Sequence, residues 1–230
     1  MTVVMIRQPG YLPYLGFFKK IQTSDIFVYL DDVLFSKDGD ENRNKIRTFA
    51  GTAWLTVPLL RPVFGKKINE VRVANHVDWS TKHKNSIKEN YKNAPYFSQY
   101  WDSIDHILSK KWTKLIDLNF ELIHYFNSIL DLSTKTVRSS ELGISSTKSV
   151  RLLEICKKLN AQTYVSGELG KNYLDENIFQ DAGIKVLYEK FHHPTYKQIH
   201  GDFVPYMCII DLLFNEGDRS KEILASSKNL

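Results

Sequence analysis

Four polar loops, each placed after a predicted strand, hold the residues of this sequence that are best suited to chemistry. The first loop is Gln8-Pro9-Gly10-Tyr11-Leu12-Pro13, where proline and glycine fix a sharp turn ahead of a predicted helix. A helix that begins there directs its free N–H groups toward any bound anion. We expect Gln8 and Tyr11 to contact a ligand through their hydrogen-bonding tips; a rigid turn without a ligand is the alternative.

The second loop begins at Asp31-Asp32 and runs on to Asn42-Arg43-Asn44. Two adjacent carboxylates can share a proton or bind a cation. Because successive strand residues point to opposite faces, we expect only one of them to act, with Asp32 as a candidate general base and Asp31 as a candidate substrate contact. The Arg43 guanidinium, flanked by Asn42 and Asn44, suits bidentate recognition of carboxylate or phosphate, although a surface ion pair is an equally common role for arginine.

The third loop, Ser166-Gly167-Glu168-Leu169-Gly170-Lys171-Asn172-Tyr173, lies between a predicted strand and a predicted helix, as a phosphate-binding loop does. It is not a Walker A motif, because its two glycines are only three positions apart. Its candidate substrate-binding residues are Ser166, Gly167, Lys171 and Tyr173.

The fourth loop, His192-His193-Pro194-Thr195-Tyr196-Lys197-Gln198, contains the only adjacent histidines of the chain. Either His192 or His193 is a candidate general base near neutral pH, and Tyr196 and Gln198 are candidate substrate contacts. Adjacent histidines on an extended segment face opposite ways, so we expect no metal site. His83 lies at the start of a predicted helix, where a histidine more often caps the helix or lies at the surface than acts on a substrate, so it is only a secondary candidate for the site.

The elements that must position these loops alternate along the chain. Strands are predicted at 3–6, 26–30, 136–138, 163–165 and 184–191, with helices at 14–21 and 148–159 and a short one near Asp175. This alternation predicts an α/β fold with a mostly parallel sheet and flanking helices, whose strand ends bring the four loops together.

Two further segments complete the predicted domain over residues 1–217. Residues 54–75 are predicted to form a small β insertion with strands at 54–59 and 70–73, and residues 80–132 to form about three helices. A last helix is expected over 204–214, followed by a polar, frayed tail over 218–230.

Composition limits the classes of protein to which the chain can belong. Its 230 residues are 43% hydrophobic, enough for a packed core, and no apolar stretch reaches the length of a membrane span. The two cysteines stand far apart and no signal peptide is evident, so we expect a cytoplasmic protein. The formal charge of +5 permits an anionic substrate or RNA without selecting either, and the sequence identifies no cofactor.

The same segments, taken in order, resemble the WbqC-like protein family. The resemblance runs from Gln8-Pro9-Gly10-Tyr11-Leu12-Pro13 through Asp31-Asp32, Asn42-Arg43-Asn44 and Tyr164-Val165-Ser166-Gly167 to Ile209-Ile210-Asp211-Leu212-Leu213-Phe214-Asn215, and so covers nearly the whole chain. It implies a role in bacterial O-antigen (lipopolysaccharide) or other surface-polysaccharide biosynthesis, with glycine transfer to an amino sugar as the activity proposed for some members. Where members often have an aromatic residue before Asn42, this chain has Asp38-Gly39-Asp40-Glu41, so its acceptor can differ.

A fold-level analogy adds to this expectation. The strand, turn, helix, strand order is similar to that of the pantothenate synthetase group, which implies a Rossmann-like sheet of the nucleotidyltransferase (HUP) kind, although Tyr14-Leu15-Gly16-Phe17 lacks that group's H-x-G-H histidines.

The leading hypothesis is an acyl or aminoacyl transferase that forms an amide on a nucleotide-linked amino sugar, with charged tRNA among the conceivable donors. The alternatives are an ATP-dependent carboxylate–amine ligase and a non-catalytic nucleotide-sugar or RNA-binding protein. The oligomeric state is left open.

Overall fold

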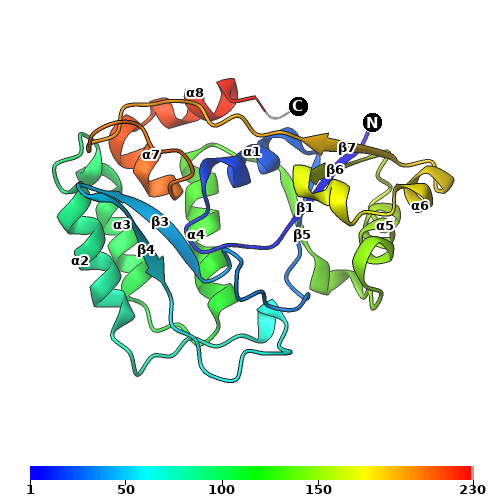
Figure 1. Ribbon diagram of the computed structural model, residues 1–230, viewed down its shortest axis with the longest axis horizontal. Coiled ribbons are helices and arrows are strands. Elements are labelled where there is room, and N and C mark those ends of the chain that lie inside the picture. Colours follow the sequence, from blue (N-terminus) through cyan, green and yellow to red (C-terminus); the bar gives the residue numbers. More distant parts are fainter. Residues whose placement is uncertain (229–230) are drawn as a thin grey trace.

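The computed structural model describes residues 1–228 and is built on a five-stranded sheet in the order β5-β2-β1-β6-β7 (Figure 1). All four strand pairs are parallel, which confirms the predicted α/β fold with a parallel sheet. The strands are β1 (Val3–Arg7), β2 (Ile26–Tyr29), β5 (Lys135–Arg138), β6 (Thr163–Gly167) and β7 (Lys185–Glu189).

Apolar residues alternate across the sheet and give it two buried faces. On β1, Met5 belongs to one hydrophobic cluster and Val4 to the other; on β2, Phe27 and Val28 divide in the same way. This follows from the period of two along a strand, and a parallel sheet covered on both faces needs apolar residues at both positions.

Helices cover both faces of the sheet. The face that carries Val4 packs against α5 (Lys148–Lys158) and α6 (Glu176–Asp181), while the other face packs against α1 (Leu15–Thr23) and the large cluster of the helical segment. Figure 1 shows that helical segment and α7 to one side of the sheet, with α5 and α6 at the far end. The three helices predicted within 80–132 are α2 (Trp79–Tyr91), α3 (Phe97–Ser109) and α4 (Leu115–Ile129).

The small β element differs from its predicted boundaries. The strands that pair are β3 (Arg43–Thr48) and β4 (Gly51–Thr56), an antiparallel hairpin that begins well before residue 54. The predicted strand over 70–73 is wrong: η1 (Ile68–Glu70) is a short 3-10 helix, and beyond it only isolated bridges form, such as the one from Leu59 to Val73. Pro58 and Pro62 lack the N–H that a continuous ladder requires.

The end of the described chain is folded rather than frayed. After α7 (Ile209–Glu216), the chain turns at Gly217 and forms α8 (Arg219–Ser226). Leu224 of α8 is fully buried, and the ammonium group of Lys19 donates hydrogen bonds to the carbonyls of Leu224 and Ala225, both 3.0 Å long. The segment from Asp218 onward is mostly polar, so its sequence did not indicate that Ile223 and Leu224 pack this helix against the core. Residues 229 and 230 of the predicted tail lie outside the described residues.

Candidate active site

A pocket of about 1050 Å³ opens at the carboxyl ends of β1, β2, β6 and β7. β2 pairs with one edge of β1, and β6, which comes later in the chain, pairs with the other edge. The strand order therefore changes direction at β1, which is the switch point of the sheet. Open parallel sheets bind their ligands at this position, because the loops on the two sides diverge there and leave a crevice. The four predicted loops therefore end near a pocket, as their placement after strands requires.

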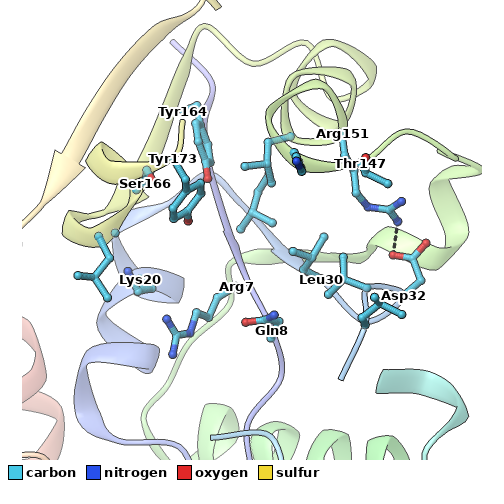
Figure 2. Close-up of a pocket in the computed structure, with 18 of the residues that line it drawn as sticks. Arg7, Gln8, Lys20, Leu30, Asp32, Thr147, Arg151, Tyr164, Ser166 and Tyr173 are labelled. Carbon is cyan, nitrogen blue, oxygen red and sulfur yellow. Dashed lines mark ion pairs between the residues drawn. The ribbon is translucent and has the colours of Figure 1, made fainter. Parts of the chain in front are cut away.

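Charged side chains line this pocket from several elements (Figure 2). Arg7 comes from the end of β1, Lys20 from α1, Asp32 from the loop after β2, Arg151 from α5 and Glu189 from the end of β7. Figure 2 shows Arg7 and Lys20 on one side of the space and the pair of Arg151 with Asp32 on the other.

Asp32 is held by an ion pair with the Arg151 guanidinium and by a 2.5 Å hydrogen bond from Ser139 Oγ. Burial by itself raises the pKa of Asp32, but the hydrogen bonds from Arg151 and Ser139 outweigh it, and the pKa lies below its ordinary value. A carboxylate stabilised in its charged form is a weak proton acceptor. In this arrangement Asp32 orients Arg151 rather than presenting a free base.

Arg151 is itself fixed at the start of α5. Its Nη1 donates to the carbonyls of Ile144 and Ser146, at 3.0 and 3.1 Å, and its side chain is almost fully buried. Among residues 1–228, its Nε has no hydrogen-bond partner. Arg151 lines the pocket, so this unpaired donor lies beside it, and a buried donor of this kind is normally satisfied.

The first turn of α5 borders the pocket beside Arg151. Ser145, Ser146, Thr147 and Lys148 line it, and the N-cap residue Thr147 makes no side-chain hydrogen bond to the turn. A helix start without a side-chain cap leaves its first N–H groups free and carries a partial positive charge. Lys148 also has a positive φ of 54°, which bends the backbone into the pocket wall.

Lys20 and Glu189 form a second ion pair in the pocket and are almost fully buried. Burial, together with the nearby Arg7 guanidinium, lowers the pKa of Lys20 to about 7, whereas the adjacent Glu189 carboxylate favours its charged form. Among the described residues, Glu189 Oε2 has no hydrogen-bond partner.

Comparison with known proteins agrees with the sequence motifs. The sequence profile of the WbqC-like protein family matches residues 8–223, which is most of the chain. The chain belongs to the WbqC-like protein family. It is also 34% identical, over 227 residues, to an uncharacterized protein of Mycobacterium tuberculosis (strain ATCC 25618 / H37Rv), a match that covers 97% of this chain and 98% of the relative. No solved structure gives a significant match.

Five of the predicted site residues of this WbqC-like chain line the pocket. They come from three of the four loops or from the strand ends before them, and are Gln8, Asp32, Ser166, Gly167 and Tyr173. Asp31, the partner of Asp32, is fully buried below the pocket instead, where it accepts hydrogen bonds from Arg138 Nε at 3.0 Å and from Ser140 N at 2.9 Å.

Tyr11 and His83 lie together in the core and not at the pocket. The Tyr11 hydroxyl donates to His83 Nδ1 at 2.9 Å, and both side chains are almost fully buried. Burial lowers the pKa of His83 to about 4, with a partly offsetting hydrogen bond to the backbone of Thr56. His83 is therefore neutral at physiological pH.

The amides of the Asn42-Arg43-Asn44 run are used within the fold. Asn42 Nδ2 donates to the carbonyl of Val57 at 2.9 Å, and Asn44 Nδ2 donates to that of Leu12 at 2.7 Å. The Arg43 guanidinium lies 4.9 Å from the ring centre of Trp54 and bonds backbone carbonyls of the preceding loop. These groups connect the hairpin to the first loop.

The fourth loop lies beside the pocket but contributes no lining histidine. His192 is exposed and its backbone N–H bonds the carbonyl of Lys228, while His193 is half-buried against Phe191 and Tyr206, which do line the pocket. Burial lowers the pKa of His193, with a partly offsetting hydrogen bond to Pro194.

The other polar residues of these loops have partners of their own. The Tyr196 hydroxyl and Gln198 Nε2 both donate to buried Asp211 of α7, at 2.7 and 2.8 Å. Lys171, from the third loop, lies 5.4 Å from the ring centre of Tyr188.

Most charged residues of the pocket were not among the sequence candidates: Arg7, Lys20, Lys67, Lys148, Arg151, Glu168 and Glu189. Arg7 and Glu189 end strands, and Ser145-Ser146-Thr147-Lys148 precedes a predicted helix, which is the available signal in the sequence. No helix in residues 1–228 is long and apolar enough to span a bilayer, and no cluster of metal-ligating side chains occurs among them.

Proposed function

We propose that the pocket binds a nucleotide-linked amino sugar and that the protein acylates the amino group, as an acyl or aminoacyl (glycine) transferase of surface-polysaccharide biosynthesis. The observation that carries this proposal is the pocket at the switch point of the sheet, bordered by the uncapped start of α5 and by Arg151. Membership of the WbqC-like family supports the polysaccharide context.

The start of α5 supports the nucleotide part of the proposal. Free backbone N–H groups, the hydroxyls of Ser145, Ser146 and Thr147, and the Lys148 and Arg151 cations offer donors and positive charge along one wall. A diphosphate needs both, and helix N-termini supply them together in many nucleotide sites. The net charge of +5 favours the approach of such an anion.

The rim of the pocket suits a flat apolar group. Leu34, Leu169, Tyr173 and Tyr206 line the pocket, and all have large exposed side chains, from 51% for Tyr206 to 75% for Leu169. Large apolar side chains gathered at the mouth of a polar pocket commonly mark a ligand surface. A nucleobase can stack on the two tyrosine rings while its diphosphate reaches the start of α5.

The pocket is large enough for a nucleotide-linked sugar. Pockets that hold one drug-sized ligand measure about 300–1,000 Å³, and this pocket measures about 1050 Å³. For amide formation, only the reacting end of an acyl donor needs to meet the sugar there.

Product formation tests the proposal directly. The protein would be incubated with UDP-, dTDP- and GDP-linked amino sugars, each with acyl-coenzyme A, a glycyl thioester or glycyl-tRNA, and products would be followed by mass spectrometry. The expected result is an amide product with at least one nucleotide-linked amino sugar, absent with its hydroxyl counterpart. The absence of product from every combination, together with no binding of any nucleotide sugar, would refute the proposal.

An ATP-dependent carboxylate–amine ligase is the second candidate, since the start of α5 with Lys148 and Arg151 is equally suited to the phosphates of ATP. A further arm of the same assay therefore supplies ATP with magnesium and free glycine in place of the acyl donor. Amide formation that occurs only in this arm and consumes ATP would replace the transferase with the ligase.

A further inference from the structure

The Lys20–Glu189 pair stands out among the charged groups of the pocket because it is buried and yet incompletely satisfied. Lys20 comes from α1 and Glu189 from the last residue of β7, with side chains only 8% and 5% exposed. Both line the pocket, so a bound ligand reaches them. Buried charges are costly even when paired, and replacing such a pair by apolar residues is often neutral or stabilising. Fold stability alone therefore gives little reason to keep charges here.

One oxygen of Glu189 is buried beside the pocket without a hydrogen-bond partner among the described residues. Its Oε1 pairs with Lys20, whereas Oε2 is buried and has no hydrogen-bond donor among residues 1–228. An ionised carboxylate accepts several hydrogen bonds, and a buried oxygen left without one carries a desolvation penalty. A ligand group that donates hydrogen bonds would remove this penalty, and an amine or ammonium does so.

A glycine at the end of β6 lies next to the pair. A Cβ built on Gly167 would have Lys20 Nζ as its nearest neighbour, 3.9 Å away. Gly167, Lys20 and Glu189 all line the pocket, so the backbone at the sheet end borders the pair. A small substrate group can approach along the backbone at this point, which is a common use of glycine at a ligand site.

The charges around the pair favour an uncharged amine. Lys20 and Arg7 both lie on this side of the pocket (Figure 2). Arg7 is engaged by Asp40, with its Nη2 3.0 Å from Oδ2, yet its charge still lowers the pKa of Lys20. By the same effect, two cations lower the pKa of an ammonium group placed beside them, which favours the loss of its proton.

We propose that Glu189, held by Lys20, accepts the proton that the acceptor amine of the substrate loses, so that this pair is the proton-transfer site of the pocket. The proposal rests on the amide-forming function proposed above and names its catalytic base. It differs from the sequence-based candidates. Asp32 accepts hydrogen bonds from both Arg151 and Ser139, which lower its pKa, whereas Glu189 is paired with Lys20 alone, and neither His192 nor His193 lines the pocket.

The chemical step balances as follows. The acceptor ammonium gives one proton to Glu189 Oε2, and the nitrogen lone pair that this releases forms the C–N bond to the carbonyl carbon of an activated acyl ester or thioester. The bond from that carbon to the donor oxygen or sulfur breaks, and its electron pair leaves with the heteroatom. The nitrogen loses a second proton, which the departing alkoxide or thiolate takes up. Glu189 then returns its proton to solvent.

Glu189→Gln is the test variant, since it keeps the shape of the side chain and removes the base. A UDP-linked 4-amino sugar and an acyl-coenzyme A or glycyl thioester serve as probes, with binding measured by calorimetry and amide formation by mass spectrometry. We expect affinity for the amino sugar within about fivefold of wild type and turnover at least 100-fold lower, in the range typical for loss of a general base.

Lys19→Gln is the matched control. Lys19 is the neighbouring lysine of α1, equally buried, but it bonds the end of α8 and does not line the pocket. Turnover by folded Lys19→Gln should stay within threefold of wild type. If Glu189→Gln does not fold, the double variant Lys20→Met/Glu189→Leu takes its place, because it removes both charges together.

The outcomes separate the two proposals. Wild-type protein that forms no amide refutes the proposed function, and the assignment of Glu189 falls with it. Wild-type protein that forms amide while folded Glu189→Gln, or the double variant, turns over within threefold of it refutes the assignment of Glu189 alone.

Discussion

Protonation of His83 should control the acid stability of the fold. Its imidazole is buried between Tyr11 and Trp79, accepts a hydrogen bond from the Tyr11 hydroxyl, and has a pKa lowered by burial from 6.5 to about 4. In the unfolded chain the same group titrates near 6.5. As the pH falls below 6.5, the unfolded state therefore takes up a proton that the folded state cannot bind, and stability is lost until the pH reaches the folded-state pKa.

The size of the effect follows from the two pKa values. They differ by about 2.5, and one pKa unit corresponds to about 1.4 kcal/mol, so the complete loss is about 3 kcal/mol. Between pH 7.5 and pH 5 the same relation gives about 2 kcal/mol. For a domain with an ordinary stability of about 5–15 kcal/mol, this is easily measured.

The assay is urea unfolding at pH 7.5 and pH 5, for wild type and His83→Asn. Asparagine offers an amide oxygen near the position of Nδ1 and does not titrate, so other groups contribute equally to both proteins. We expect wild type to lose about 2 kcal/mol more than the variant between the two pH values. Equal losses, or a larger loss in the variant, would show that His83 is accessible to protons and would refute its placement in the core.

Three other substitutions test separate parts of the molecule. Tyr196→Phe removes a hydrogen bond to the buried Asp211 carboxylate and should lower the free energy of unfolding by about 2 kcal/mol. Its affinity for the nucleotide sugar should not change, and reduced affinity at full stability would place Tyr196 in the binding site instead. Leu224→Ala should cost about 2–5 kcal/mol in urea unfolding, because Leu224 is fully buried, and a cost near zero would mean that α8 is frayed. Thr147→Asp adds a negative charge at the start of α5. It should keep the free energy of unfolding or raise it by up to about 1 kcal/mol, and should weaken the binding of a UDP-linked sugar at least tenfold. Unchanged affinity in calorimetry would argue against a bound anion at this helix start.

The arrangement of strands and helices follows largely from local sequence patterns. Val3-Val4-Met5-Ile6 and Ile26-Phe27-Val28 are continuous apolar runs, which strands covered on both faces require, and a helical pattern joins the first run to the second. The hairpin was misplaced because Arg43 to Thr48 is mostly polar and pairs through its backbone, which leaves no apolar alternation to detect.

The candidate site was predictable in position but not in detail. Parallel strands end at one edge, so Gln8, Asp32 and Ser166 were expected to lie near one another, and all three line the pocket. An amide or hydroxyl has the same hydrogen-bonding capacity whether its partner is a ligand or the protein itself. The sequence therefore could not show that Asn44 bonds the carbonyl of Leu12, or that Tyr196 bonds Asp211.

Two charged pocket residues could not be predicted, because a sequence does not show which distant side chain each of them meets. Lys20 and Arg151 lie on predicted amphipathic helices, where a cation usually faces solvent. Their burial depends on partners distant in sequence, Glu189 for Lys20 and Asp32 for Arg151, and such a pairing becomes visible only when the sheet brings both groups to one edge.

Calorimetric titration of a UDP-linked amino sugar into wild type, Arg151→Met and His83→Asn tests the central claim most directly. We expect saturable binding to wild type and affinity at least tenfold weaker for Arg151→Met, because the pocket loses the buried cation beside the start of α5. Affinity should be unchanged for His83→Asn at pH 7.5, since His83 lies in the core. Absence of binding to wild type, or equal affinity of wild type and folded Arg151→Met, would contradict the assignment of this pocket as a nucleotide-sugar site.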